Sequence, residues 1–128
     1  MLARYKMYRG TRPLDDPLPQ GIRCDTRYKT KHCLRPGKEH VEKYLANPSG
    51  KTWQLFMKKY LSLLESRFSS DRTFFDKLAE QAIVEDIWLG CSCPTQKNPD
   101  VYRCHTVLAL RFMKQKYPDI KVVLPQKD

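Results

Sequence analysis

The sequence has no apolar run that approaches the roughly 20 residues of a membrane-spanning helix. Its first residues lack the long apolar segment of a secretory signal peptide, so we expect a cytoplasmic protein with no membrane partner. Internal repeats, low-complexity tracts and linkers are missing as well, which predicts one domain over residues 1–128. With 41% hydrophobic and 30% charged residues, such a chain can bury a core.

Acidic residues are scarce: 14 Asp and Glu stand against 24 Lys and Arg, for a net charge of +10. The imbalance is greatest in residues 1–37, where nine basic side chains face three acidic ones. This basic segment predicts an anionic partner, such as a phosphate-bearing ligand or a nucleic acid. Basic surfaces also keep proteins soluble, so the charge alone does not choose between these interpretations.

Cysteine is present, but in a number that argues against a disulfide framework. The chain has five cysteines, which is an odd number, and no secretion signal accompanies them. We therefore expect reduced thiols.

The pattern of apolar residues divides the chain into a basic, loop-rich part (1–37) and a core of helices and strands (38–128). The spacing predicts strands over residues 2–8, 84–90 and 120–124, with a short strand at 22–24, and helices over 38–46, 51–66, 72–82 and 103–116. Ser49 is expected to cap the second helix, and Ser70 or Asp71 the third. This order predicts an α/β fold, a single Rossmann-like three-layer domain with a small, mainly parallel sheet.

Three cysteines and a histidine gather where one predicted strand leads into one predicted helix. The apolar run from Ile87 ends in Cys91 and Cys93, and after a polar loop Cys104 and His105 open the last helix. Open α/β folds usually bind their ligands at such strand-to-helix junctions. The sequence therefore predicts the functional site here.

Three interpretations of this cluster are open. The four side chains are of the types that bind zinc, but only one residue separates Cys91 from Cys93, and adjacent side chains on a helix diverge by about 100°. These spacings predict no metal. A second interpretation is a reactive thiol at a helix N-terminus, with Cys104 or Cys93 as nucleophile and His105 as acid or base. In the third, the cysteines are small apolar core residues.

The exposed N–H groups at the start of the last helix also predict an anion site. Arg9 and Arg12 follow the first strand and should lie at the same sheet edge as Cys91, with Arg27 as the next candidate. We therefore expect a phosphate-bearing, nucleotide-like ligand, bound by Arg9, Arg12, Arg27 and Cys91. The sequence identifies no cofactor and leaves both an enzyme and a binding protein open.

The alternative function is a non-catalytic nucleic-acid-binding module. It would use the basic segment 1–37, with Tyr5, Tyr8 and Tyr28 as stacking platforms for bases. No recognition helix, zinc finger or RNA-binding motif is visible in the sequence to support it.

The C-terminal half resembles small bacterial and phage proteins. The residues that carry the resemblance are Trp53, Phe56, Tyr60, Leu78-Ala79, the stretch from Leu89 to Pro94, Cys104-His105 and Leu108-Ala109. They are similar to two families of domains of unknown function, numbered 488 and 4326 in that series, and Tyr8-Arg9-Gly10-x-Arg12 also looks like the first-strand motif of the second. The resemblance implies a Rossmann-like fold in which a strand ends in cysteine and a Cys-His pair opens a helix.

Overall fold

The structure is a computed structural model that describes residues 1–126 as three strands and four α-helices. The strands are β1 (Leu2–Lys6), β2 (Ile22–Asp25) and β3 (Ile87–Cys91). The α-helices are α1 (Lys38–Ala46), α2 (Gly50–Ser70), α3 (Thr73–Val84) and α4 (His105–Lys116), and the 3₁₀-helix η1 (Val101–Arg103) precedes α4. The predicted α/β class is confirmed.

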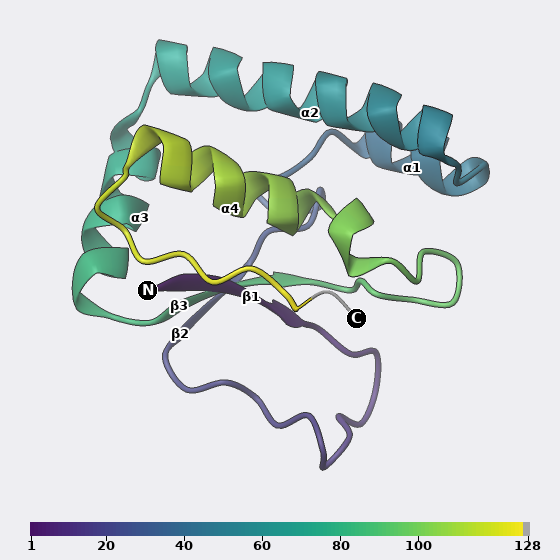
Figure 1. The fold of residues 1–128 in the computed structure, drawn as a ribbon, viewed down its shortest axis with the longest axis horizontal. Coiled ribbons are helices and arrows are strands. Elements are labelled where there is room, and N and C mark those ends of the chain that lie inside the picture. Colours follow the sequence, from purple (N-terminus) through teal and green to yellow (C-terminus); the bar gives the residue numbers. More distant parts are fainter. Residues whose placement is uncertain (127–128) are drawn as a thin grey trace.

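The sheet is parallel throughout, in the order β1-β3-β2. The connection from β1 to β2 crosses the sheet in one direction, and the connection from β2 to β3 returns. Two right-handed crossovers that run in opposite directions must lie on opposite faces. Figure 1 shows this: α2 and α4 cover one face, whereas the irregular segment 7–21 passes over the other. There Trp88 of β3 donates through Nε1 to the carbonyl of Gln20 at 2.8 Å.

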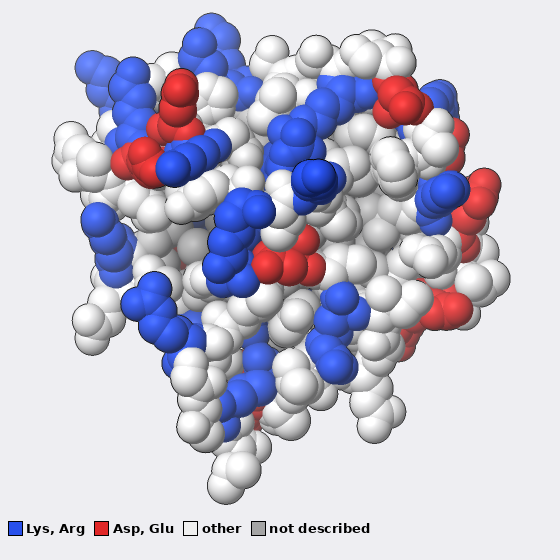
Figure 2. All heavy atoms as spheres, turned by 180° about the vertical axis from the view of Figure 1, so that it is seen from behind, with Lys and Arg blue, Asp and Glu red and all other residues white. Residues whose placement is uncertain are grey.

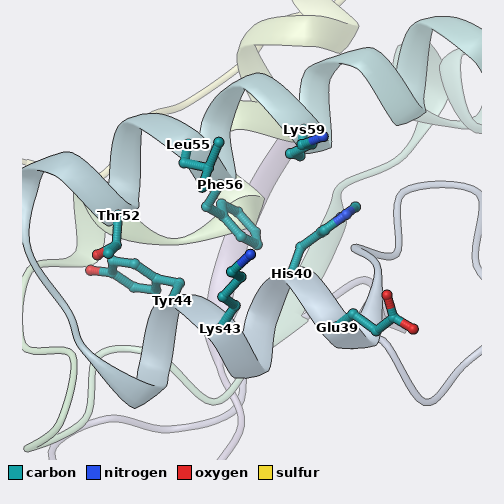
Figure 3. Close-up of a pocket in the computed structure, with 8 residues that line it drawn as sticks. All are labelled: Glu39, His40, Lys43, Tyr44, Thr52, Leu55, Phe56 and Lys59. Carbon is teal, nitrogen blue, oxygen red and sulfur yellow. The ribbon is translucent and has the colours of Figure 1, made fainter.

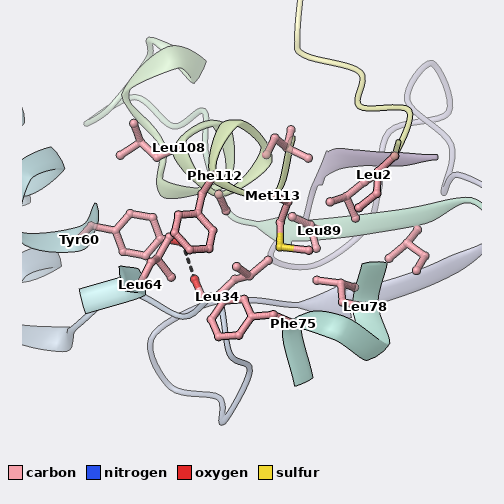
Figure 4. Close-up of a cluster of buried hydrophobic side chains, with 14 of the residues drawn as sticks. Leu2, Leu34, Tyr60, Leu64, Phe75, Leu78, Leu89, Leu108, Phe112 and Met113 are labelled. Carbon is pink, nitrogen blue, oxygen red and sulfur yellow. Dashed lines mark hydrogen bonds between the residues drawn. The ribbon is translucent and has the colours of Figure 1, made fainter. Parts of the chain in front are cut away.

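The core lies between the sheet and the helices (Figure 4). Leu2, Ile87 and Leu89 point into it from the strands and are fully buried. The predicted apolar face of α2 is confirmed as core, because four of its residues are buried at helical spacing: Trp53, Phe56, Tyr60 and Leu64.

α4 is the central element of the helical layer. It contacts β1 and β3 on one side and α2 on another, so its side chains meet protein around most of the helix. Buried side chains run without a gap from His105 to Leu110 and resume at Phe112 and Met113. Of the helices in residues 1–126, none pairs the length of a membrane span with the apolar composition that one needs.

Several element boundaries differ from the predicted ones by a few residues. Ser49 caps α2 as predicted, and its Oγ accepts from the backbone N–H of Thr52 at 3.1 Å. At α3 the capping position is Arg72, but the Asp71 carboxylate still accepts from the N–H of Thr73 at 3.0 Å. Val84 ends α3 instead of opening a strand, and is 77% exposed.

The predicted final strand over 120–124 is wrong. Val122 makes an isolated bridge to Leu2, supported by two backbone hydrogen bonds, Leu2 N to Lys121 O at 2.8 Å and Val123 N to Leu2 O at 3.0 Å. Beyond this bridge the chain leaves the sheet, and the carbonyl of Pro125 accepts instead from the Tyr102 hydroxyl. The apolar residues here resemble a strand in sequence, but Val123 and Leu124 stay partly exposed.

Tyr60 attaches the irregular segment before α1 to the core. Its buried hydroxyl donates to the carbonyl of Leu34 at 2.6 Å, the dashed line in Figure 4.

Tyr60→Phe should lower the free energy of unfolding by about 1–3 kcal/mol, because the buried carbonyl of Leu34 then has no donor. Urea denaturation measures this. Tyr28→Phe, at a 38% exposed tyrosine, is the control and should change stability little; equal effects of the two variants would contradict the prediction.

Candidate functional site

The polypeptide between β3 and α4 brings three cysteine sulfurs together. Cys91 ends β3, Cys93 follows it, and Cys104 precedes the first residue of α4. The Sγ atoms of these three residues all lie within 4.8 Å of one another. Cys104 is at the capping position with φ −125° and ψ 142°, an extended conformation outside the helix. Cys104 and His105 therefore do not diverge as two residues on one regular helix would, and the predicted gathering of thiols at this junction is present.

Asn98 organises the loop that carries Cys93. Its side-chain Nδ2 donates to the carbonyl of Arg103 at 2.8 Å and to Cys93 Sγ at 3.5 Å, and its Oδ1 accepts from the Tyr44 hydroxyl at 2.9 Å. The backbones of Thr95 and Asn98 exchange two further hydrogen bonds. This buried amide thus connects both arms of the loop to α1.

His105 is buried beside Cys91, and its two ring nitrogens have different neighbours. Nε2 lies 2.9 Å from Thr26 Oγ1, and Nδ1 lies 3.7 Å from Cys91 Sγ. The Thr26 hydroxyl has one proton, which it donates to the Gly90 carbonyl at 3.0 Å. Oγ1 must therefore accept from Nε2–H, and the neutral ring presents the lone pair of Nδ1 toward Cys91.

Gly90 allows the close packing of the strand beneath this site. A Cβ at this position would lie 2.7 Å from Met7 Sδ and 2.9 Å from Tyr5 Cε1. Its carbonyl accepts from both the N–H and the hydroxyl of Thr26, at 3.1 and 3.0 Å. Thr26, directly after β2, is thereby held against the end of β3.

Negative charge in the cluster is best accommodated on Cys104. Hydrogen bonds from the neighbouring thiols, first Cys91 and then Cys93, hold the pKa of Cys104 well below its ordinary value. The same interactions raise the pKa of Cys91, and the pKa of Cys93 rises to about 11, mainly through its hydrogen bond to Cys104. Cys104 also stands at a helix N-terminus, where the positive end of the dipole favours a thiolate.

Access to the cluster is limited. Cys104 and His105 are 2% and 4% exposed, and Cys91 is 8% exposed. Cys93 is partly exposed. A ligand in solution therefore has little access to the proposed nucleophile Cys104 or to the proposed acid or base His105 in this conformation.

The predicted arginines occupy different places. Arg27 pairs with Asp25 at 2.8 Å and reaches Ser92 Oγ at 3.5 Å, beside the cluster. Arg12 is bonded to the end of β1 through the Lys6 carbonyl, and to segment 7–21 through the carbonyl and carboxylate of Asp16. Arg9 is an exposed residue of the bend after β1. Of these three, Arg27 has a hydrogen bond to the junction.

Arg4, which the sequence analysis did not select, is bonded to the cluster directly. Its Nη2 donates to the carbonyl of Cys93 at 2.5 Å and its Nε to Thr106 Oγ1 at 2.9 Å. Thr26 and Asn98 were missed as well. Thr26 lies two residues after the short strand predicted at 22–24, and this position could have pointed to it, because parallel strands end at one edge of the sheet.

An open groove borders the cluster on the side of segment 7–21. It has a volume of about 400 Å³, and its lining comes from β1, segment 7–21, Trp88 and Pro94. Pro94 directly follows Cys93. Another hollow, of about 240 Å³, lies between α1 and α2 (Figure 3), and none of the predicted site residues lines it.

No family model, curated protein or solved structure matches the chain. The resemblance to the two families of unknown function therefore stays a prediction.

The hydrogen bonds at Thr26 predict the tautomer of His105. Nitrogen-15 NMR of the imidazole should find the proton on Nε2 at neutral pH. Thr26→Val should remove this preference and lower the free energy of unfolding by about 1–3 kcal/mol, because the buried His105 N–H loses its acceptor and the Gly90 carbonyl loses one of its two donors. Thr26→Ser, which keeps the hydroxyl, should restore the tautomer. A ring protonated on Nδ1 in the unaltered protein would contradict the assignment.

Proposed function

We propose that the protein recognises a nucleotide-like ligand, with an aromatic base and at least one phosphate, in the groove beside the Cys/His junction. The observation that carries the proposal is the composition of this groove. Three cationic and three aromatic side chains line it: Arg4, Lys6 and Arg12, with Tyr5, Tyr8 and Trp88. Its volume of about 400 Å³ lies within the usual range for small-ligand sites.

The charge of the groove favours a phosphate. Asp16 is its one acidic lining residue, and this carboxylate accepts from Arg12 and from the Tyr8 hydroxyl. Arg12 thus compensates Asp16, and Arg4 and Lys6 supply the surplus positive charge. The Lys6 ammonium lies 4.8 Å from the centre of the Tyr8 ring, so a cation and an aromatic face stand side by side.

Recognition is better supported than catalysis. The groove reaches the junction at Pro94 and at Arg4, whose guanidinium is bonded to the Cys93 carbonyl. The sulfur of Cys104 and the ring of His105 are buried behind this segment. A ligand in the groove would contact the outside of the junction, not these two side chains.

On the face of the molecule shown in Figure 2, the charge distribution supports a small ligand better than a long nucleic acid. On the face shown in Figure 2 the Lys and Arg side chains form separate groups, with carboxylates and neutral surface between them. A nucleic-acid-binding surface would follow the phosphate backbone with a continuous positive stripe.

Isothermal titration calorimetry with ADP, inorganic phosphate and a single-stranded oligonucleotide tests the proposal. ADP should bind more tightly than phosphate, because the aromatic side chains add stacking with the base. Lys6→Ala should weaken ADP binding roughly tenfold, the usual effect of losing one hydrogen bond to a charged group. Lys51→Ala removes the same charge from an exposed position on α2 outside the groove and should leave affinity unchanged.

Three results would overturn the proposal. The first is the absence of ADP binding, and the second is an equal loss of ADP affinity in the two lysine variants. The third is oligonucleotide binding that falls steeply with salt and does not respond to Lys6→Ala, which would favour the basic nucleic-acid-binding module.

A further inference from the structure

We propose that Cys91, Cys93, Cys104 and His105 form a tetrahedral zinc site with three sulfur ligands and one nitrogen ligand. The inference is independent of the groove, because it rests on the convergence of the three sulfurs and on the position of His105 Nδ1, 3.7 Å from Cys91 Sγ. Three thiols and an imidazole are a common ligand set of structural zinc, and the soft thiolates select zinc over magnesium or calcium.

Two arguments from residue spacing predicted no metal, and neither of them holds in the structure. Cys104 stands outside α4 in an extended conformation, so the usual divergence of neighbouring helical side chains does not apply. Cys91 ends β3 and Cys93 follows it by two residues, so the single residue between them does not keep their sulfurs apart. The result is that all three sulfurs lie within 4.8 Å of one another.

The position of His105 supports its role as the fourth ligand. A tetrahedral zinc ion with ordinary bond lengths holds its sulfur and nitrogen ligands about 3.6 Å apart. Nδ1 of His105 lies 3.7 Å from Cys91 Sγ. With Nε2–H donated to Thr26 Oγ1, Nδ1 has the lone pair that a metal requires. A ligating histidine almost always donates its second N–H in this way.

The surroundings suit a centre of net negative charge. Three thiolates around Zn²⁺ leave one negative charge, and the N-terminus of α4 adjoins it. Asn98 Nδ2 donates to Cys93 Sγ at 3.5 Å, and Thr106 Oγ1 lies 3.1 Å from Cys104 Sγ. The guanidinium of Arg4 is bonded to the carbonyl of Cys93 at 2.5 Å. Binding would release the thiol protons to solvent, and would join the end of β3 to the start of α4.

Metal content and cobalt spectroscopy test the site on the full chain. Protein expressed with zinc in the medium should contain one equivalent by mass spectrometry of the metal. After removal of zinc, Co²⁺ should give intense visible bands of a tetrahedral centre and a sulfur-to-cobalt charge-transfer band. Competition with a chelator then gives the affinity.

The chain supplies its own matched controls. Cys93→Ser, at the partly exposed ligand, should retain the fold by circular dichroism but weaken Co²⁺ binding by more than the roughly 10–100-fold that losing an outer partner costs. Cys24→Ser and Cys33→Ser alter the two free cysteines outside the cluster and should leave the cobalt spectrum unchanged. His105→Gln should shift the visible bands, since the nitrogen ligand is lost.

A pale, six-coordinate cobalt spectrum in the unaltered protein would overturn the inference. So would equal weakening of Co²⁺ binding by Cys93→Ser and Cys24→Ser. An unchanged cobalt spectrum in a folded His105→Gln protein would overturn the assignment of His105 as the fourth ligand. None of these measurements depends on ADP binding, so failure of the metal site and failure of the groove are separate results.

Discussion

The arrangement of this protein depends on the burial of the first two turns of α4 against the parallel sheet. Every side chain from His105 to Leu110 is buried there, in contact with elements that include β1, β3 and α2. A helix end buried in this way must find partners for its polar side chains inside the protein. The junction supplies them: Arg4 reaches Thr106 from β1, and Thr26 reaches His105 from the end of β2. The convergence of the cysteines follows from the same packing, since Cys91 and Cys104 are the residues at which β3 ends and α4 is about to begin.

Much of the fold could be predicted from local pattern. The spacing of Trp53, Phe56, Tyr60 and Leu64 fixes which face of α2 is buried, and the Ser49 side chain marks where that helix starts. The final strand could not be predicted, because the residues around Val122 have a suitable apolar composition, but only this one residue pairs with β1. Whether such a segment forms a strand depends on the part of the protein with which it would pair. The sequence of the segment carries no information about that partner.

The candidate site likewise has one part that could be predicted from the sequence and another that could not. The cluster of Cys91, Cys93 and Cys104 follows from chain order, because a strand that ends and a helix that begins beside it must bring their termini together. The partners that orient it come from distant positions: Arg4 is bonded to Cys93 across 89 residues and Thr26 to His105 across 79. Basic residues near the first strand suggested Arg9 and Arg12, but net charge does not reveal which guanidinium turns inward. Arg12 is bonded to the end of β1 and to its own segment, because the carbonyls of Lys6 and Asp16 lie within its reach.

The groove and the thiol cluster share one short piece of chain, and this connects the two proposals. Cys93 belongs to the cluster, whereas Pro94, the next residue, lines the groove. Arg4 lies across this boundary, since its guanidinium is bonded to the Cys93 carbonyl and its side chain lines the groove. A metal held by Cys93 would fix the position of Pro94 and of the carbonyl that orients Arg4. Metal binding would thus preorganise one wall of the groove, and preorganisation raises affinity by reducing the entropy lost on binding. A buried metal centre could therefore support ligand recognition without touching the ligand.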